Sequence, residues 1–347
     1  MVIDNLDELR VVNALAAERQ VDADVALRIS GCMHYATLLR SRFGFNFEDV
    51  VTQVVNTLPA AEQGRLNIGG VHFHLEGYCP GHRISAIRQS MGVIEGLRRC
   101  GYRPRFLDIG GGIPVSYLQS DLEWTQFWSE HRRALLGLRK PITYRNHTLG
   151  YTVYDGRLLG APHCYPFYNH LTRDKWLSHI LDAKVNGSTI ASMLRDRRLE
   201  LRCEPGRSVL DGCGMTVARV EYRKQTYDGE WLIGLSMNGH QCRTSSDDYL
   251  VDPLLVRGRD AWGDDSLCAD SVDGFLVGNY CMETDLLMLR KLRFPSGVRR
   301  GDLVVFPNTA GYFMHFKESP SHQHPLAQNV IVDWDSGPPR LDPIDNG

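Results

Sequence analysis

The stretch that most constrains the fold is Cys203-Glu204-Pro205-Gly206-Arg207-Ser208, which closes the largely apolar segment 199–201. An apolar segment that ends at Pro-Gly is typical of a strand followed by a turn. The turn holds a carboxylate and a guanidinium three residues apart, with a glycine amide beside the guanidinium. The carboxylate suits a cationic ring nitrogen, and the arginine with the amide suits a phosphate. We therefore expect a ligand site at this strand end.

Segments typical of strands and helices alternate through the first 200 residues. Strands are predicted at 2–3, 25–29, 68–75 and 105–109, and amphipathic helices at 6–19, 47–58 and 84–100. This alternation predicts a parallel sheet with helical crossovers, and a barrel is the favoured closure at this length. From residue 208 onward, short segments between Gly, Asp and Pro turns predict a β-domain. We expect residues 1–207 to form an α/β barrel and residues 208–347 an all-β domain.

An insertion at about 140–170 interrupts the barrel pattern. It is rich in Tyr, His, Asn and Gly, and Asp155-Gly156 predicts the turn of a β-hairpin. The hairpin could be a lid that contributes to specificity or a plain surface feature, and the sequence favours neither. A last strand is predicted at 326–334, and the Pro-rich tail after it is expected to fray.

Four further motifs accompany the 203–208 turn. They are Gly70-Val71-His72-Phe73-His74, Leu107-Asp108-Ile109-Gly110-Gly111-Gly112, Gly278-Asn279-Tyr280-Cys281 and Gly311-Tyr312. In this order and approximate spacing, the set resembles the fold-type III pyridoxal-phosphate decarboxylases of ornithine, arginine and diaminopimelate. The resemblance implies an alanine-racemase-like barrel that binds pyridoxal 5'-phosphate, followed by a β-domain. It also implies a homodimer that decarboxylates an amino acid.

The run of three glycines follows a predicted strand. Successive glycine amides can form a concave site for an anion, although such runs also occur in tight barrel turns. The resemblance implies that the cofactor phosphate contacts Gly110, Gly111, Gly112, Gly206, Arg207 and the hydroxyl of Tyr312.

Glu204 and His74 are expected to hold the cofactor ring. By resemblance, Glu204 pairs with the pyridine nitrogen and keeps it protonated, which makes the ring a better acceptor of electrons. His74 is placed by the resemblance against the ring face. His72 shares its side of the strand because side chains alternate. Without the other motifs, a salt-bridged glutamate and two packed histidines would explain these residues.

A metal site is the alternative interpretation of the same strand. His72 and His74, with Glu76 and His82 nearby, fit the ligand set of a zinc-dependent barrel hydrolase. No later strand end supplies a clear His and Asp pair, so we predict no metal ligands. Glu76-Gly77 also stands where the family usually has Gly-Ser for the phosphate, which places an acidic group near that anion.

Cys281 and Asp285 are candidate residues of the second domain. By resemblance, Cys281 reaches across a dimer interface and returns a proton to the substrate carbon, and Asp285 binds the substrate. Met282 replaces the acidic residue that recognises the far end of the substrate in the family, so the substrate is not specified. The alternative for Cys281 is a small buried apolar residue.

The family's Schiff-base lysine has no counterpart in the expected context. The family carries it on the first barrel strand in a Tyr-x-x-Lys sequence, whereas residues 1–139 contain no lysine. We expect this chain alone to be a poor or inactive catalyst, as a shortened product or a degenerate paralogue. A non-catalytic pyridoxal-phosphate-binding regulator is therefore an open alternative.

Bulk properties exclude several classes of partner. The formal net charge is −2, which gives no broad attraction to nucleic acid or acidic membranes. Nine scattered cysteines without a C-x-x-C spacing argue against a disulfide framework or structural zinc. The amino terminus does not resemble a signal peptide, and no apolar run approaches a membrane span. We expect a cytoplasmic protein with a small-molecule substrate.

Overall fold

The computed structural model describes residues 1–62, 64–243, 248–259, 270–333, 335 and 337–346. The chain divides into two compact units. Unit 1 comprises residues 1–114 and 171–209, and unit 2 comprises residues 115–170 and 210–347. Residues 115–170, which the sequence assigns to the barrel domain, thus make their contacts within the second unit.

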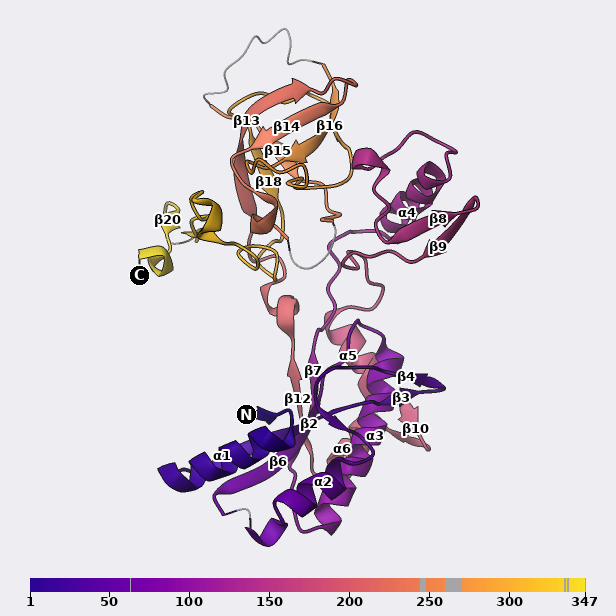
Figure 1. The fold of residues 1–347 in the computed structure, drawn as a ribbon, viewed down its shortest axis with the longest axis vertical. Helices are drawn as coiled ribbons and strands as arrows, with labels where there is room; N and C mark the ends of the chain where they lie inside the picture. Colours follow the sequence, from indigo (N-terminus) through magenta and orange to yellow (C-terminus); the bar gives the residue numbers. More distant parts are fainter. Residues whose placement is uncertain (63, 244–247, 260–269, 334, 336, 347) are drawn as a thin grey trace. The chain divides into compact units, whose positions relative to one another are not determined.

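Unit 1 is built on a six-stranded parallel sheet (Figure 1). Every strand pair in it is parallel. Neighbours follow chain order, as in an arc of a β/α barrel, and the predicted partial barrel is confirmed. The strands in sheet order are β1 (Val2–Ile3), β2 (Ala23–Ser30), β6 (Leu66–Phe73), β7 (Phe106–Gly111) and β12 (Glu200–Glu204), with β5 (Phe45–Asn46) paired to β2.

The helices of unit 1 pack on this sheet through one apolar face each. They are α1 (Leu6–Arg19), α2 (Val50–Thr57), α3 (Pro80–Arg99), α5 (Arg173–Leu181) and α6 (Ile190–Asp196). Asn5 caps α1 by accepting a hydrogen bond from the Glu8 amide at 3.0 Å. On α3, Ile87, Ile94 and Leu97 are fully buried at helical spacing. Two short hairpins complete the unit: β3 (Met33–His34) with β4 (Thr37–Leu38), and β10 (Lys184–Val185) with β11 (Ser188–Thr189).

Unit 2 contains the predicted β-domain. Its six-stranded sheet is antiparallel except for the parallel pair of β14 and β16. The order is β15 (Leu254–Val256), β18 (Leu303–Phe306), β13 (Thr216–Gln225), β14 (Trp231–Leu235), β16 (Val272–Val277) and β17 (Leu292–Phe294). Alternating burial along β18 places Val304 and Phe306 in the core.

The insertion is packed into unit 2. It contains an antiparallel hairpin of β8 (Tyr151–Tyr154) and β9 (Arg157–Gly160), and α4 (Asp121–Leu135) precedes it in the same unit. Asp155 and Gly156 both have positive φ, at 47° and 67°, as expected for a two-residue hairpin turn, so the predicted hairpin is confirmed. Trp128 of α4 shares a hydrophobic core with Val220 of β13.

The carboxy-terminal segment departs from the sequence-based expectation. Of the strand predicted at 326–334, only β19 (Val330–Ile331) forms among the described residues, and Trp334 lies outside them. The tail that was expected to fray instead contributes β20 (Arg340–Leu341), which pairs with β19. The paired amides and carbonyls hold this segment in place. No described helix has the length and apolar character needed to cross a membrane.

Candidate cofactor site

His72 of β6, His74 directly after this strand and Glu204 at the end of β12 meet in unit 1. Nε2 of His72 lies 3.7 Å from one carboxylate oxygen of Glu204, and Nδ1 of His74 lies 3.7 Å from the other. The side-chain alternation of a strand places both histidines on one side, as the sequence predicts. The Glu204 side chain is half exposed, so a ligand can reach its carboxylate.

Glycine in the intervening strand allows this meeting. β7 lies between β6 and β12, and Gly111 is paired with Glu204 in the register. A Cβ at Gly111 would lie 2.9 Å from Cε1 of His74 and 3.2 Å from the Glu204 carbonyl oxygen. Any larger residue at 111 would therefore push the histidine ring away from the carboxylate.

His72 is a buried polar side chain without a hydrogen bond. The residue is 3% exposed, and neither ring nitrogen has a hydrogen-bond partner among the described residues. Burial lowers the pKa of His72, although Asp108 and Glu204 act in the opposite direction. Such groups are rare in folded proteins, and they commonly mark a site that a water molecule or a ligand completes.

The three-glycine turn requires glycine on steric grounds. Gly110 has φ of +70°, and a Cβ there would lie 2.3 Å from the Phe73 carbonyl oxygen. The turn's amides all donate within the protein. Gly110 N donates to Asp108 Oδ1 at 2.8 Å, Gly111 N to His74 Nδ1 at 3.2 Å, and Gly112 N to the Glu204 carbonyl at 3.1 Å. A phosphate on these amides would replace one of those acceptors.

The two predicted ligand-binding turns lie side by side. Gly112 N bonds the Glu204 carbonyl, and Ile113 N bonds the Pro205 carbonyl at 3.2 Å. Gly206 and Arg207 follow in a 3-10 turn, and Gly206 has φ of +64°. The 110–112 and 204–207 segments therefore share one edge of the sheet, as the resemblance implies.

Arg83 is a site residue that was not predicted from the sequence. It is fully buried on α3, and one guanidinium nitrogen donates to the Leu75 carbonyl at 2.8 Å and to the Gly111 carbonyl at 3.3 Å. Burial lowers the pKa of Arg83 to about 10. Arg83 thus links the segment that follows β6 to the end of β7. Its signal was present in the sequence, because position 83 shares the apolar face of α3 with Ile87 and Ile94.

Three predicted site residues belong to unit 2. Cys281 is exposed, which contradicts the alternative that it is a small buried residue. Asp285 is buried, and its carboxylate accepts hydrogen bonds from the amides of Gly239 and Tyr280 at 2.8 and 2.9 Å. Tyr312 is 47% exposed, with φ of +69°. The cofactor and substrate roles of these residues remain predictions.

The histidine–glutamate group also has the composition of a metal site. One ligand atom each from His72, His74 and Glu204 lies within 4.8 Å of the others. Glu76 and His82, which the hydrolase interpretation requires, are not members of this group. The same group also suits a ring with a protonated nitrogen, since the half-exposed Glu204 carboxylate lies beside the exposed ring of His74.

The fold is an arc of an α/β barrel followed by a β-domain, and comparison with known proteins supports the pyridoxal-phosphate decarboxylase type. Residues 1–140 match the family model described as "Pyridoxal-dependent decarboxylase, pyridoxal binding domain". The chain is 32% identical over 308 residues to the uncharacterized protein y4yA of Sinorhizobium fredii, covering 88% of this chain and 62% of the relative. It is 23% identical over 340 residues to diaminopimelate decarboxylase of Pseudomonas aeruginosa, covering 95% of this chain and 64% of the relative.

Solved structures agree on the fold. Diaminopimelate decarboxylase of M. jannaschii, in complex with L-lysine, matches with a TM-score of 0.65 at 16% identity, covering 98% of this chain and 65% of that one. The arginine decarboxylase of Paramecium bursaria Chlorella virus, bound to agmatine, matches with a TM-score of 0.60 at 17% identity, over 93% of this chain and 68% of that one. The comparisons support the fold-type III pyridoxal-phosphate decarboxylase family, whose cofactor is pyridoxal phosphate. It spans just over three fifths of the length of the two curated relatives above.

Proposed function

We propose that unit 1 binds pyridoxal phosphate and that the protein is an amino-acid decarboxylase. The observation that carries the proposal is the Glu204 carboxylate, which is held at a strand end 3.7 Å from each of two histidine rings. When bound, the cofactor supplies a ring that accepts the electrons left on the substrate carbon as carboxylate departs. Glu204 would hold a proton on the ring nitrogen, and His74 would orient the ring.

The phosphate would lie where two turns meet. Gly110, Gly111, Gly112 and Gly206 supply backbone without side chains, and Arg207 supplies a cation. Entry of the phosphate requires one glycine amide to exchange its present acceptor for a phosphate oxygen, a near-balanced exchange of hydrogen bonds. Arg83 holds the carbonyl side of Gly111 and would keep the turn in shape during the exchange.

We propose that Cys281 and Asp285 act on the substrate. Cys281 is exposed and can deliver a proton from its sulfur to the substrate carbon. Asp285 is held in one orientation by two amides and would bind a cationic group of the substrate through its remaining lone pairs. Both roles are completed in a homodimer, in which the cysteine loop serves the partner's substrate.

The lysines of unit 1 determine whether this chain can bind the cofactor covalently. Unit 1 contains two lysines, Lys175 on α5 and Lys184 on β10, and both are exposed. We propose that this chain binds pyridoxal phosphate reversibly, without a covalent link, and has low or no decarboxylase activity alone. The comparisons favour neither the non-catalytic regulator nor the metal-dependent hydrolase over the decarboxylase.

Borohydride reduction tests this proposal. The chain is saturated with pyridoxal phosphate, reduced with borohydride and denatured, and its mass is then determined by mass spectrometry. We expect saturable binding before reduction and an unchanged protein mass afterwards. A mass increase of one reduced cofactor that maps to a lysine of unit 1 would overturn the non-covalent part of the proposal.

A further inference from the structure

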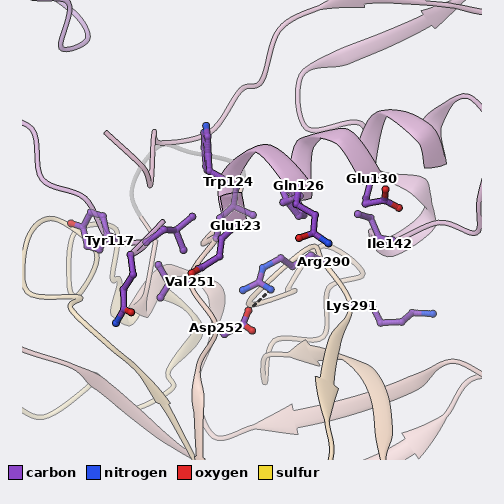
Figure 2. Close-up of a pocket in the computed structure, with 14 residues that line it drawn as sticks. Tyr117, Glu123, Trp124, Gln126, Glu130, Ile142, Val251, Asp252, Arg290 and Lys291 are labelled. Carbon is purple, nitrogen blue, oxygen red and sulfur yellow. Dashed lines mark ion pairs between the residues drawn. The ribbon is translucent and has the colours of Figure 1, made fainter. Parts of the chain in front are cut away.

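A cavity of about 670 Å³ lies entirely within unit 2 (Figure 2). It shares no residue with the cofactor site described above. Its volume falls in the range of small-molecule sites. One wall comes from residues 117–119, α4 and Ile142, and the other comes from residues 250–252 and 290–291.

The wall that includes Ile142 is fixed to the β-domain by backbone hydrogen bonds. Tyr144 N donates to the Leu289 carbonyl at 2.7 Å, and Lys291 N donates to the Ile142 carbonyl at 2.8 Å. Arg290 and Thr143 form the β-bridge between these two bonds. The two walls are therefore held in register, and the cavity is part of the folded unit.

Arg290 has a guanidinium edge that the protein does not use. Its Nη1 pairs with Asp252 Oδ1 at 2.5 Å. Its Nε and Nη2 are buried and have no hydrogen-bond partner among the described residues. Nε and Nη2 form the side-on edge of the guanidinium, which binds a carboxylate through two parallel hydrogen bonds. The edge is covered, so a ligand reaches it after a side-chain rotation of the kind common on binding.

The remaining charges around the cavity favour a ligand that also carries a cation. Lys291 is committed to Glu230, 2.7 Å away, and Glu130 is committed to Arg133 at 2.9 Å. Glu123 and Asp252 are exposed carboxylates on the lining. In Figure 2, Glu123 points from α4 toward the part of the cavity that holds the Arg290–Asp252 pair, whereas Lys291 points away.

Apolar side chains supply the rest of the lining. Trp124 and Phe127 are partly buried on α4 and pack against the core of unit 2. Their cavity-facing surface joins that of four further residues, Leu118, Ile142, Leu250 and Val251. An apolar or aromatic group of a ligand would be removed from water here, and the aromatic rings favour offset or edge contacts with another ring.

We propose that this cavity binds a free amino acid with an apolar side chain. Its carboxylate occupies the Nε–Nη2 edge of Arg290, its ammonium lies toward Glu123 and Asp252, and its side chain packs against Trp124 and Phe127. The site goes beyond the proposed decarboxylase site, because none of its residues is assigned to cofactor or substrate. The competing explanation is a purely structural Arg290, paired electrostatically with the buried Asp248, whose Oδ2 also lacks a hydrogen-bond partner.

Titration calorimetry of the full chain with three probes tests the proposal. L-Phenylalanine carries all three groups, L-phenylalaninamide lacks the carboxylate, and 3-phenylpropanoate lacks the ammonium. We expect saturable heat with L-phenylalanine and about tenfold or greater weakening with each analogue, because each loses a charge-assisted hydrogen bond. The heat of L-phenylalanine binding should persist in Glu204→Gln, which distinguishes this site from the cofactor site.

Two variants assign the contacts. Arg290→Lys keeps the charge but loses the two parallel guanidinium donors. It therefore weakens the binding of L-phenylalanine about tenfold and leaves the binding of L-phenylalaninamide unchanged. Glu123→Gln weakens L-phenylalanine and leaves 3-phenylpropanoate unchanged, with exposed Glu18→Gln as the matched control. If circular dichroism shows that Arg290→Lys does not fold, the Glu123→Gln variant and the three probes still test the proposal.

Two outcomes would overturn the proposal. One is the absence of saturable heat with L-phenylalanine in a folded wild-type chain, which would leave Arg290 as a structural partner of Asp248. The other is equal binding of all three probes, or unchanged L-phenylalanine binding in Glu123→Gln, since either would remove the zwitterion-specific contacts.

Discussion

Nε2 of His72 lies 3.7 Å from Oε1 of Glu204, although β6 and β12 are not neighbours in the sheet. The neighbouring contact of His74 with Glu204 crosses β7 at Gly111. A buried imidazole without a hydrogen bond and a half-exposed carboxylate are thereby placed at one sheet edge.

The pH dependence of stability should contain a contribution from His72. Burial lowers its pKa, so the unfolded chain takes up a proton below about pH 6.5 while the folded chain resists it. The free energy of unfolding should then fall as the pH drops below that value. The largest slope for one proton is about 1.4 kcal/mol per pH unit. Denaturation from neutral to mildly acidic pH should show a shallower slope for His72→Asn, and exposed His179→Gln serves as control. Equal slopes for wild type and His72→Asn would refute the buried neutral ring.

The glycine turn should tolerate no side chain at position 110. Gly110→Ala places a Cβ 2.3 Å from the Phe73 carbonyl oxygen, in addition to the strain of φ at +70°. Gly77→Ala is the matched control, because Gly77 has the same φ and no atom within 4 Å of the added Cβ. Chemical denaturation should show a loss of about 1 kcal/mol for Gly77→Ala from backbone strain alone. Gly110→Ala should lose clearly more. Similar losses in both variants would mean that the turn is not packed against β6.

Arg83 should stabilise unit 1 and the shape of the glycine turn. Arg83→Met leaves the Leu75 and Gly111 carbonyls without their buried donor. We expect a loss of about 2–3 kcal/mol in the free energy of unfolding. Arg88→Met changes an exposed arginine on the same helix and should lie within about 0.5 kcal/mol of wild type. A neutral effect of Arg83→Met would show that those carbonyls find other donors.

Much of the fold could be predicted because local signals agree with it. The alternation of apolar segments gave the parallel arc, and Asp155-Gly156 gave the hairpin turn, because few other residues accept positive φ at both positions. The meeting of 110–112 with 204–207 was implied by the family resemblance. These features depend on backbone geometry, which the residue types restrict directly.

Other features depend on tertiary packing that no local pattern encodes. The sequence does not reveal that residues 115–170 join unit 2, because the contact of Trp128 with the β-domain core is long-range. The pairing of β20 with β19 was missed for the same reason. The internal acceptors of the glycine amides were also missed, since Asp108 was read only as part of a strand.

The most direct test of the central claim is equilibrium binding of pyridoxal phosphate to the full chain, followed by its absorbance and by tryptophan fluorescence. We predict saturable one-to-one binding that weakens about tenfold or more in Glu204→Gln, since a charge-assisted hydrogen bond to the ring nitrogen is lost. Glu200→Gln, on the same strand and exposed beside Arg202, should bind like wild type. No saturable binding to the wild-type chain, or equal affinities for the Glu204→Gln and Glu200→Gln variants, would contradict the assignment of this strand end as the pyridoxal site.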